Sequence, residues 1–175
     1  MPAIQEQLNA ALIVFALSLA FIDWRTHRIP NLLCAVAAMI GLVLQTGLHG
    51  EAGLFAALGG AAVGFAMFLP FYVVRAFGAG DVKAMTTVGI FLGVQGTVLA
   101  VGVTLIGGAV LGALTLWLKP AHANATLHRL VGLLLTPVAA VRDARRNRSS
   151  DSSLRFPYGI AIACGAAVAL IIKTH

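Results

Sequence analysis

Residues 84–118 form an apolar stretch of 35 residues without one charged side chain. A single helix of this length would reach about 52 Å, whereas the hydrocarbon core of a bilayer is about 30 Å thick. The stretch therefore predicts two helices with a break at Gly93-Val94-Gln95-Gly96. The whole chain is 59% hydrophobic and only 10% charged. Because an ordinary soluble domain has about 25% charged residues, the composition indicates that lipid is the solvent for most of the chain.

The other apolar stretches complete an all-α membrane protein with six transmembrane helices. We expect these helices at about 4–22, 31–48, 52–74, 82–94, 97–118 and 156–173. Of the 12 Lys and Arg residues, all except Lys173 fall in the intervening segments 23–30, 75–83 and 119–155. The positive-inside rule assigns these segments to the cytoplasm. Both termini are then expected in the periplasm.

We interpret residues 1–175 as a single polytopic domain, with residues 119–155 as a cytoplasmic loop. Within this loop, residues 127–141 are apolar but short for a span, and a crossing there would invert the C-terminal topology. They predict an interfacial helix that lies on the inner leaflet or dips into it. The net charge of +6 is concentrated in loops between spans, which favours lipid headgroups over nucleic acid as the partner.

Small residues inside the apolar stretches predict close packing. Gly60-x-x-x-Gly64 and Gly108-x-x-x-Gly112 allow helix backbones to approach one another. Cys34 and Cys164 lie in apolar runs without metal-ligand spacing. We interpret both cysteines as small buried apolar residues.

Asp23 and Asp81 are two of only six acidic residues, and each lies where an apolar stretch meets a basic loop. An ionisable residue at the edge of a span marks a functional site by default. Two carboxyl groups that share a site cannot both ionise easily, so one is protonated and one is charged near neutral pH. Such a pair can activate a water molecule and protonate a substrate carbonyl, without metal or cofactor. The sequence has no H-E-x-x-H motif and no G-x-S-x-G elbow that would compete with this chemistry.

Gly78 and Gly80 precede Asp81 and are expected to end the third helix. Glycine also allows a substrate backbone to approach closely. Asp81 would then begin the next helix, where the helix dipole favours its charged form. This predicts that Asp81 is the base and Asp23 the acid. On its own, the G-x-G-D run fits equally well an ordinary turn in which Asp81 is the helix N-cap.

Three stretches resemble the type IV prepilin peptidases, bacterial aspartyl proteases with a GxGD motif. The run D-W-R-T-H-R-I-P-N at 23–31 is similar to the first catalytic block of that family, and G-A-G-D-V-K at 78–83 is similar to the second. Pro157-Tyr158-Gly159 is similar to the P-[FY]-G element that opens the last span. The resemblance covers nearly the whole chain and is strongest to the short form that serves Flp/Tad-type pili.

The resemblance implies that Asp23 and Asp81 are the catalytic pair of an enzyme in the bacterial inner membrane. It implies a prepilin substrate whose short basic leader is cut at the cytoplasmic face, after a Gly and just before its apolar helix. The long members of the family have an N-terminal domain with two C-x-x-C pairs and also methylate the new N-terminus. This chain lacks those cysteines, so we expect peptidase activity without methyltransferase activity.

Other residues of these stretches have simpler interpretations. Arg25, Arg28 and Lys83 would not attract a basic leader, so we assign them to lipid phosphates rather than to substrate. Pro30 and Asn31 are expected to shape the start of the second helix. The resemblance makes all five residues candidates for positioning the aspartates or the substrate.

Two other classes of function stay open. A proton- or ion-coupled transporter subunit could use the same aspartates as ion ligands, but it should have polar groups near the bilayer midplane. The predicted spans have few such groups, chiefly Thr86, Thr87 and Thr104. A non-catalytic factor for pilus assembly would tolerate the loss of either aspartate. The sequence does not indicate an oligomeric state.

Overall fold

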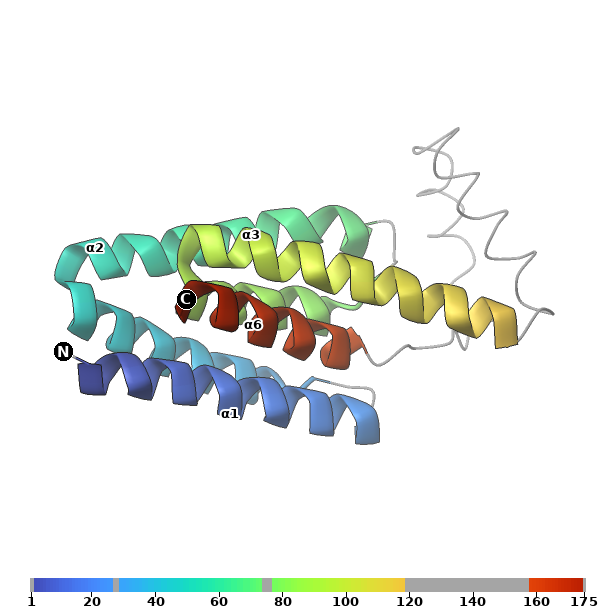
Figure 1. Cartoon of the computed structure of the whole chain (residues 1–175), viewed down its shortest axis with the longest axis horizontal. Helices are drawn as coiled ribbons and strands as arrows, with labels where there is room; N and C mark the ends of the chain where they lie inside the picture. The colour runs from blue at the N-terminus through green and yellow to red at the C-terminus, as the bar shows by residue number, and fades with distance from the viewer. Residues whose placement is uncertain (1, 27–28, 74–76, 119–157, 175) are drawn as a thin grey trace.

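The computed structural model describes residues 2–26, 29–73, 77–118 and 158–174 (Figure 1). This part of the chain is all-helical, as predicted. Its helices are α1 (Pro2–Thr26), α2 (Asn31–Val73), α3 (Ala79–Leu118) and α6 (Tyr158–Thr174). The predicted interfacial helix at 127–141 and the loop 119–155 lie outside the described residues.

Gly50 and Gly93 each divide a long helix into two segments. Gly50 has φ 60° and ψ −135°, and Gly93 has φ 71° and ψ −176°. Residues with a Cβ rarely adopt such backbone angles, whereas glycine adopts them readily. The predicted break at 93–96 is therefore confirmed, at its first residue. Four helices with two breaks make six helical segments.

The segments run back and forth along one axis (Figure 1). Both termini lie at one end of the bundle, together with the turns at Gly50 and Gly93. The end of α1 and the starts of α2, α3 and α6 lie at the opposite end, which we call the site end. Asp23, Asp81 and Tyr158 belong to these helix ends, so the fold gathers them from three helices.

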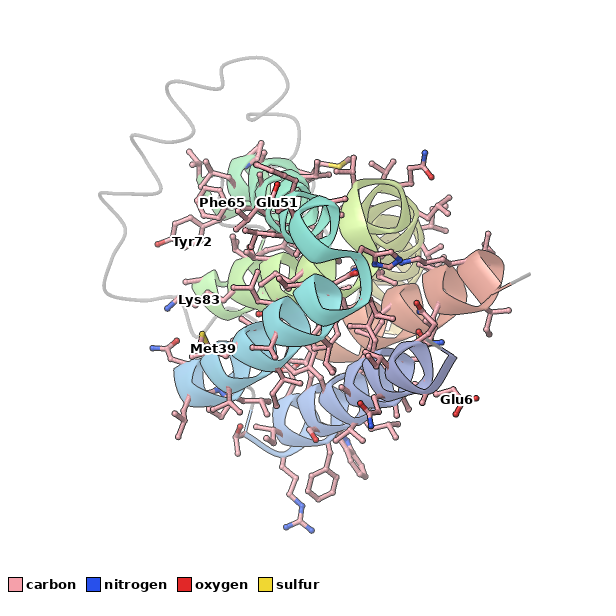
Figure 2. The ribbon with its side chains drawn as sticks, turned by 90° about the vertical axis from the view of Figure 1, so that its left-hand side faces the viewer. Glu6, Met39, Glu51, Phe65, Tyr72 and Lys83 are labelled. Carbon is pink, nitrogen blue, oxygen red and sulfur yellow. The ribbon has the colours of Figure 1, made fainter. Side chains whose placement is uncertain are left out.

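The outside of the bundle is strongly apolar. Met39 is 63% exposed and Phe65 is 48% exposed, and both side chains are directed outward (Figure 2). Within the described residues, three helical stretches are long and apolar enough to cross a membrane, namely Ala3–Thr26, Asn31–Val73 and Ala79–Val110, and Tyr158–Lys173 is a shorter apolar helix. The chain is therefore a membrane protein. Six separate crossings, and periplasmic termini, stay predictions.

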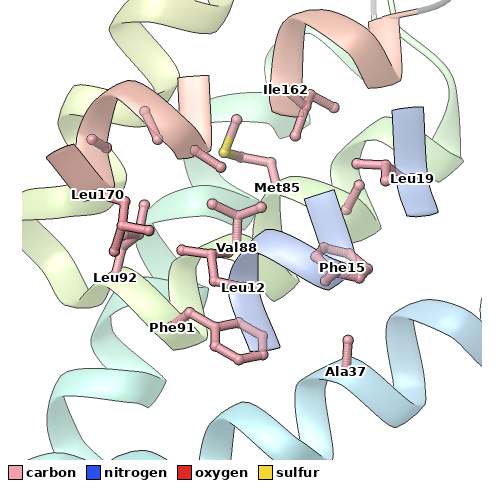
Figure 3. Packing of buried hydrophobic residues seen from close by; sticks show 14 of the residues in the cluster. Leu12, Phe15, Leu19, Ala37, Met85, Val88, Phe91, Leu92, Ile162 and Leu170 are labelled. Atoms are coloured by element: carbon pink, nitrogen blue, oxygen red, sulfur yellow. The ribbon is translucent and has the colours of Figure 1, made fainter. Parts of the chain in front are cut away.

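The first segment of α3, residues 79–92, forms the centre of the bundle. Its buried side chains, among them Met85, Val88 and Phe91, pack against residues of every other helix (Figure 3). These partners are Leu12 and Phe15 of α1, Ala37 of α2, and Ile162 and Leu170 of α6. Glycines allow this segment to approach α2. A Cβ added to Gly60 or Gly89 would overlap the carbonyl of the other residue, and one added to Gly64 would lie 2.7 Å from Met85 O.

The packing role predicted for Gly60 and Gly64 is thus confirmed. The cysteine prediction is confirmed for Cys34, which is buried, and is wrong for Cys164, which is exposed on α6. Apolar composition alone cannot tell a side chain that faces other helices from one that faces lipid, because both surroundings are apolar.

Candidate active site

Asp23 lies near the end of α1 and is held by the start of α6. Its side chain is only 5% exposed, and its Oδ2 accepts a hydrogen bond of 2.7 Å from the backbone N–H of Gly159. A Cβ on Gly159 would lie 2.7 Å from Cβ and 2.8 Å from Oδ2 of Asp23. Real Cβ atoms essentially never approach so closely. Glycine at position 159 is therefore what allows the N–H to reach the carboxylate.

Asp81 is held by its own turn. The residue is 9% exposed, and its Oδ2 accepts a hydrogen bond of 2.9 Å from the N–H of Gly78. In return, Gly78 O accepts hydrogen bonds from the N–H groups of Asp81 (3.1 Å) and Val82 (3.4 Å). The side chain of Asp81, three residues after the N-cap Gly78, thus binds the N-cap N–H as in one half of a capping box, and glycine has no side chain to supply the other half.

The structure corrects two predictions about the start of α3. Asp81 is not the N-cap residue, since Gly78 occupies that position. Gly80 does not help to end the preceding helix, because α2 ends at Val73 and Gly80 lies inside α3. Gly80 instead packs under the connection between α1 and α2, and a Cβ there would lie 3.1 Å from Cβ of Ile29.

Contacts between neighbouring residues link the two carboxyl groups. Asp23 is bound by Gly159 and Asp81 by Gly78, and the residues directly before these glycines, Tyr158 and Phe77, pack edge-on with ring centroids 4.6 Å apart. Asp23, Asp81, Tyr158 and Gly159 therefore gather at the site end, contributed by α1, α3 and α6.

The sequence matches the model of the type IV leader peptidase family over residues 10–116. The matched stretch is more than half of the chain and contains both aspartates. The chain belongs to the type IV leader peptidase family. No curated protein and no solved structure matched. Membership indicates a peptidase, and the matched stretch stops before α6, which supplies Tyr158 and Gly159.

In this member of the leader peptidase family, the two sequence blocks, residues 23–31 and 78–83, contact one another. Lys83 Nζ donates a hydrogen bond of 2.9 Å to Oδ1 of Asn31. Gly80, three positions before Lys83, packs against Ile29, two positions before Asn31. α2 begins at Asn31, and Pro30 O accepts a hydrogen bond of 3.5 Å from the N–H of Cys34. Pro30 and Asn31 thus shape the start of α2, as expected.

Arg25 and Lys83, the two basic candidates that the structure describes, each contact a residue other than the aspartates. The guanidinium of the exposed Arg25 lies 5.3 Å from the ring centroid of Phe21, and Lys83 is engaged by Asn31. Arg28 and Pro157 lie outside the described residues. Among the residues that are described, no three His, Cys, Asp or Glu side chains form a group that could hold a metal ion; a metal-free and cofactor-free mechanism stays a prediction.

An aromatic cluster that was not predicted from the sequence surrounds Tyr158. The Phe77 ring lies edge-on to Tyr158 with centroids 4.6 Å apart, and it stacks on Phe68 with centroids 4.9 Å apart. On the other side, a Cβ on Gly108 would lie 3.1 Å from Cε1 of Tyr158. Phe77 directly precedes Gly78, so the turn that holds Asp81 is also the turn that contacts Tyr158. The aromatic residue before the G-x-G-D run was the available signal.

Proposed function

We propose that this protein is an aspartyl endopeptidase that removes the short leader from Flp-type type IV prepilins. One observation carries the proposal: two largely buried carboxyl groups, Asp23 and Asp81, lie at the same end of the bundle, and the turns that hold them are in contact through Tyr158 and Phe77. The observation gains weight from membership of a leader peptidase family.

In the proposed mechanism, the two carboxyl groups share one proton and hold the attacking water. The N–H groups of Gly159 and Gly78 engage Oδ2 of Asp23 and of Asp81, so we assign the water to the Oδ1 atoms. The ionised carboxylate takes a proton from the water while the water oxygen bonds to the carbonyl carbon of the substrate. The neutral carboxyl protonates the carbonyl oxygen. The tetrahedral intermediate then collapses: the C–N bond breaks as the carboxyl that took the water proton gives it to the leaving amine, and the other carboxylate takes back the proton that it gave to the carbonyl oxygen.

The acid and the base are best treated as one unit. The helix dipole was the reason to assign Asp81 as the base. The same argument now applies to Asp23, since it accepts its hydrogen bond from the first turn of α6. A coupled pair titrates with values that belong to the pair, and either aspartate can take either role.

The site at a bundle end suits a cut at the membrane surface. We propose that the six segments cross the bacterial inner membrane with the site end in the cytoplasm, as the distribution of Lys and Arg suggests. The apolar helix of the prepilin would then lie in the bilayer, with its basic leader on the cytoplasmic side. We propose peptidase activity without methyltransferase activity.

Coexpression with a short pilin precursor tests this function directly. The mass of the pilin N-terminus should correspond to cleavage before the apolar helix. Asp23→Asn and Asp81→Asn should each abolish cleavage while the protein still inserts into the membrane, because neither amide can take up or give the required proton. Cleavage by either variant at the wild-type rate would show that the pair is not catalytic. Pili that still assemble with either variant would favour the assembly factor.

A further inference from the structure

At the break at Gly93, three consecutive backbone carbonyls each accept a hydrogen bond from a side chain. Gln45 Nε2 donates to Phe91 O at 2.9 Å. Lys173 Nζ donates to Leu92 O at 3.2 Å. Thr97 Oγ1 donates to Gly93 O at 2.5 Å. We call Gln45, Thr97 and Lys173 the carbonyl clamp.

The position of the break explains why such donors are needed. The last carbonyls of an α-helix have no partner within the helix. Residues 79–92 span only about 20 Å, less than the roughly 30 Å of the hydrocarbon core. Because Asp81 lies at the site end, the carbonyls at the break do not reach the opposite membrane surface. Gln45 is 3% exposed and Thr97 is 0% exposed, so these two donors stand in for water inside the bundle, whereas Lys173 is exposed and reaches Leu92 O from the surface.

The three donors come from three different parts of the fold. Gln45 belongs to the first segment of α2, Thr97 to the second segment of α3, and Lys173 to the last turn of α6. Lys173 is also the single Lys or Arg outside the three basic segments of the sequence. A cation at the C-terminal end of a helix interacts favourably with the helix dipole, which gives this isolated charge a role.

We infer that the carbonyl clamp fixes the depth and rotation of the short helix 79–92, and thereby positions Asp81 opposite Asp23 from the far end of the bundle. The segment is then held at both ends, by the clamp at Phe91, Leu92 and Gly93 and by the Lys83–Asn31 hydrogen bond at its start. The three clamp residues are positioning residues, since they touch backbone and not the carboxyl groups. The catalytic consequence rests on the proposed peptidase function, whereas the clamp itself does not.

Amide hydrogen exchange of the protein in lipid nanodiscs tests the clamp without any assay of activity. Lys173→Met and Gln45→Met should speed exchange in residues 82–93 about tenfold, and Lys173→Arg should restore wild-type exchange. Thr46→Val is the matched control. Thr46 Oγ1 donates to Leu42 O within its own helix, so this variant removes a side-chain hydrogen bond next to Gln45 that does not reach the break, and it should leave residues 82–93 unchanged.

Leader cleavage provides the second measurement. Lys173→Met should lower kcat about tenfold with KM unchanged, and Lys173→Arg should restore kcat. Lys173→Gln is a milder second variant should Lys173→Met fail to accumulate, and it should give an intermediate kcat. Wild-type exchange in residues 82–93 of both Met variants would overturn the clamp. Faster exchange throughout α1 and α6, or faster exchange in residues 82–93 with wild-type kcat, would overturn the positioning role. A wild-type protein that cleaves no prepilin would overturn the proposed function and leave the exchange result standing.

Discussion

The N–H of Gly159 donates a 2.7 Å hydrogen bond to Oδ2 of Asp23, across 136 positions of the sequence. Asp81 accepts its hydrogen bond from Gly78, three positions away. One carboxylate is therefore held by its own turn, and the other depends on the docking of α6 against α1. The pair can only be complete after the last helix has packed, which makes the start of α6 a part of the site.

Gly159→Ala should lower activity more than alanine at Gly78 or Gly80, the glycines of the G-x-G-D run. Its Cβ would lie 2.7 Å from Cβ of Asp23, so α6 or the carboxylate must move. A displacement of about 1 Å in a catalytic group can cost about 100-fold in rate, and we expect a loss of that order in kcat for leader cleavage. Gly102→Ala is the control, because a Cβ there meets nothing within 4 Å. Similar rates for the two variants would contradict this account of Asp23.

The two glycines of the G-x-G-D run should differ in their tolerance of alanine. A Cβ on Gly78 would lie 3.4 Å from Oδ2 of Asp81, an ordinary contact, and the N–H that binds the carboxylate is kept. A Cβ on Gly80 would lie 3.1 Å from Cβ of Ile29, so the connection between α1 and α2 must shift. We expect Gly80→Ala to lower the cleavage rate clearly more than Gly78→Ala, measured at equal protein levels in the membrane. The reverse order would mean that substrate access, rather than packing, requires glycine at 78.

The sequence predicted those features that depend on length, charge and local geometry. A 35-residue apolar stretch is too long for one span, so a break near Gly93 followed from bilayer thickness. The contacts that complete the site could not be predicted, because no local pattern pairs Asp23 with Gly159 or Gln45 with the carbonyl of Phe91. The N-cap at Gly78 was missed for a different reason. Asp is the more frequent N-cap residue, but here the Asp81 side chain reaches back to the cap from inside the helix.

The cleavage rate should show a bell-shaped dependence on pH. The proposed mechanism needs one ionised and one neutral carboxyl group, so activity is lost at low pH, where both are protonated, and at high pH, where both are ionised. The apparent pKa values belong to the pair and are read from the two limbs of kcat/KM against pH. The measurement needs purified protein with a prepilin peptide. Activity that rises through the acid range and stays level to alkaline pH would indicate a single titrating group and contradict the shared proton.

Phe77→Ala should impair catalysis although Phe77 touches neither aspartate in any contact described above. Its ring packs edge-on against Tyr158 and face-on against Phe68, and it connects the turn that holds Asp81 to the residue before Gly159. Loss of the ring would leave a cavity, and we expect a destabilisation of about 3 kcal/mol together with a lower kcat.

Phe77→Leu keeps most of the volume and should recover stability more fully than kcat, because a leucine cannot reproduce the aromatic contact with Tyr158. Phe55→Ala is the control, since Phe55 is 71% exposed on α2 and its loss leaves no cavity. Thermal unfolding and leader cleavage, measured on the same purified variants, separate the two effects; equal recovery of both in Phe77→Leu would reduce Phe77 to a space-filling role.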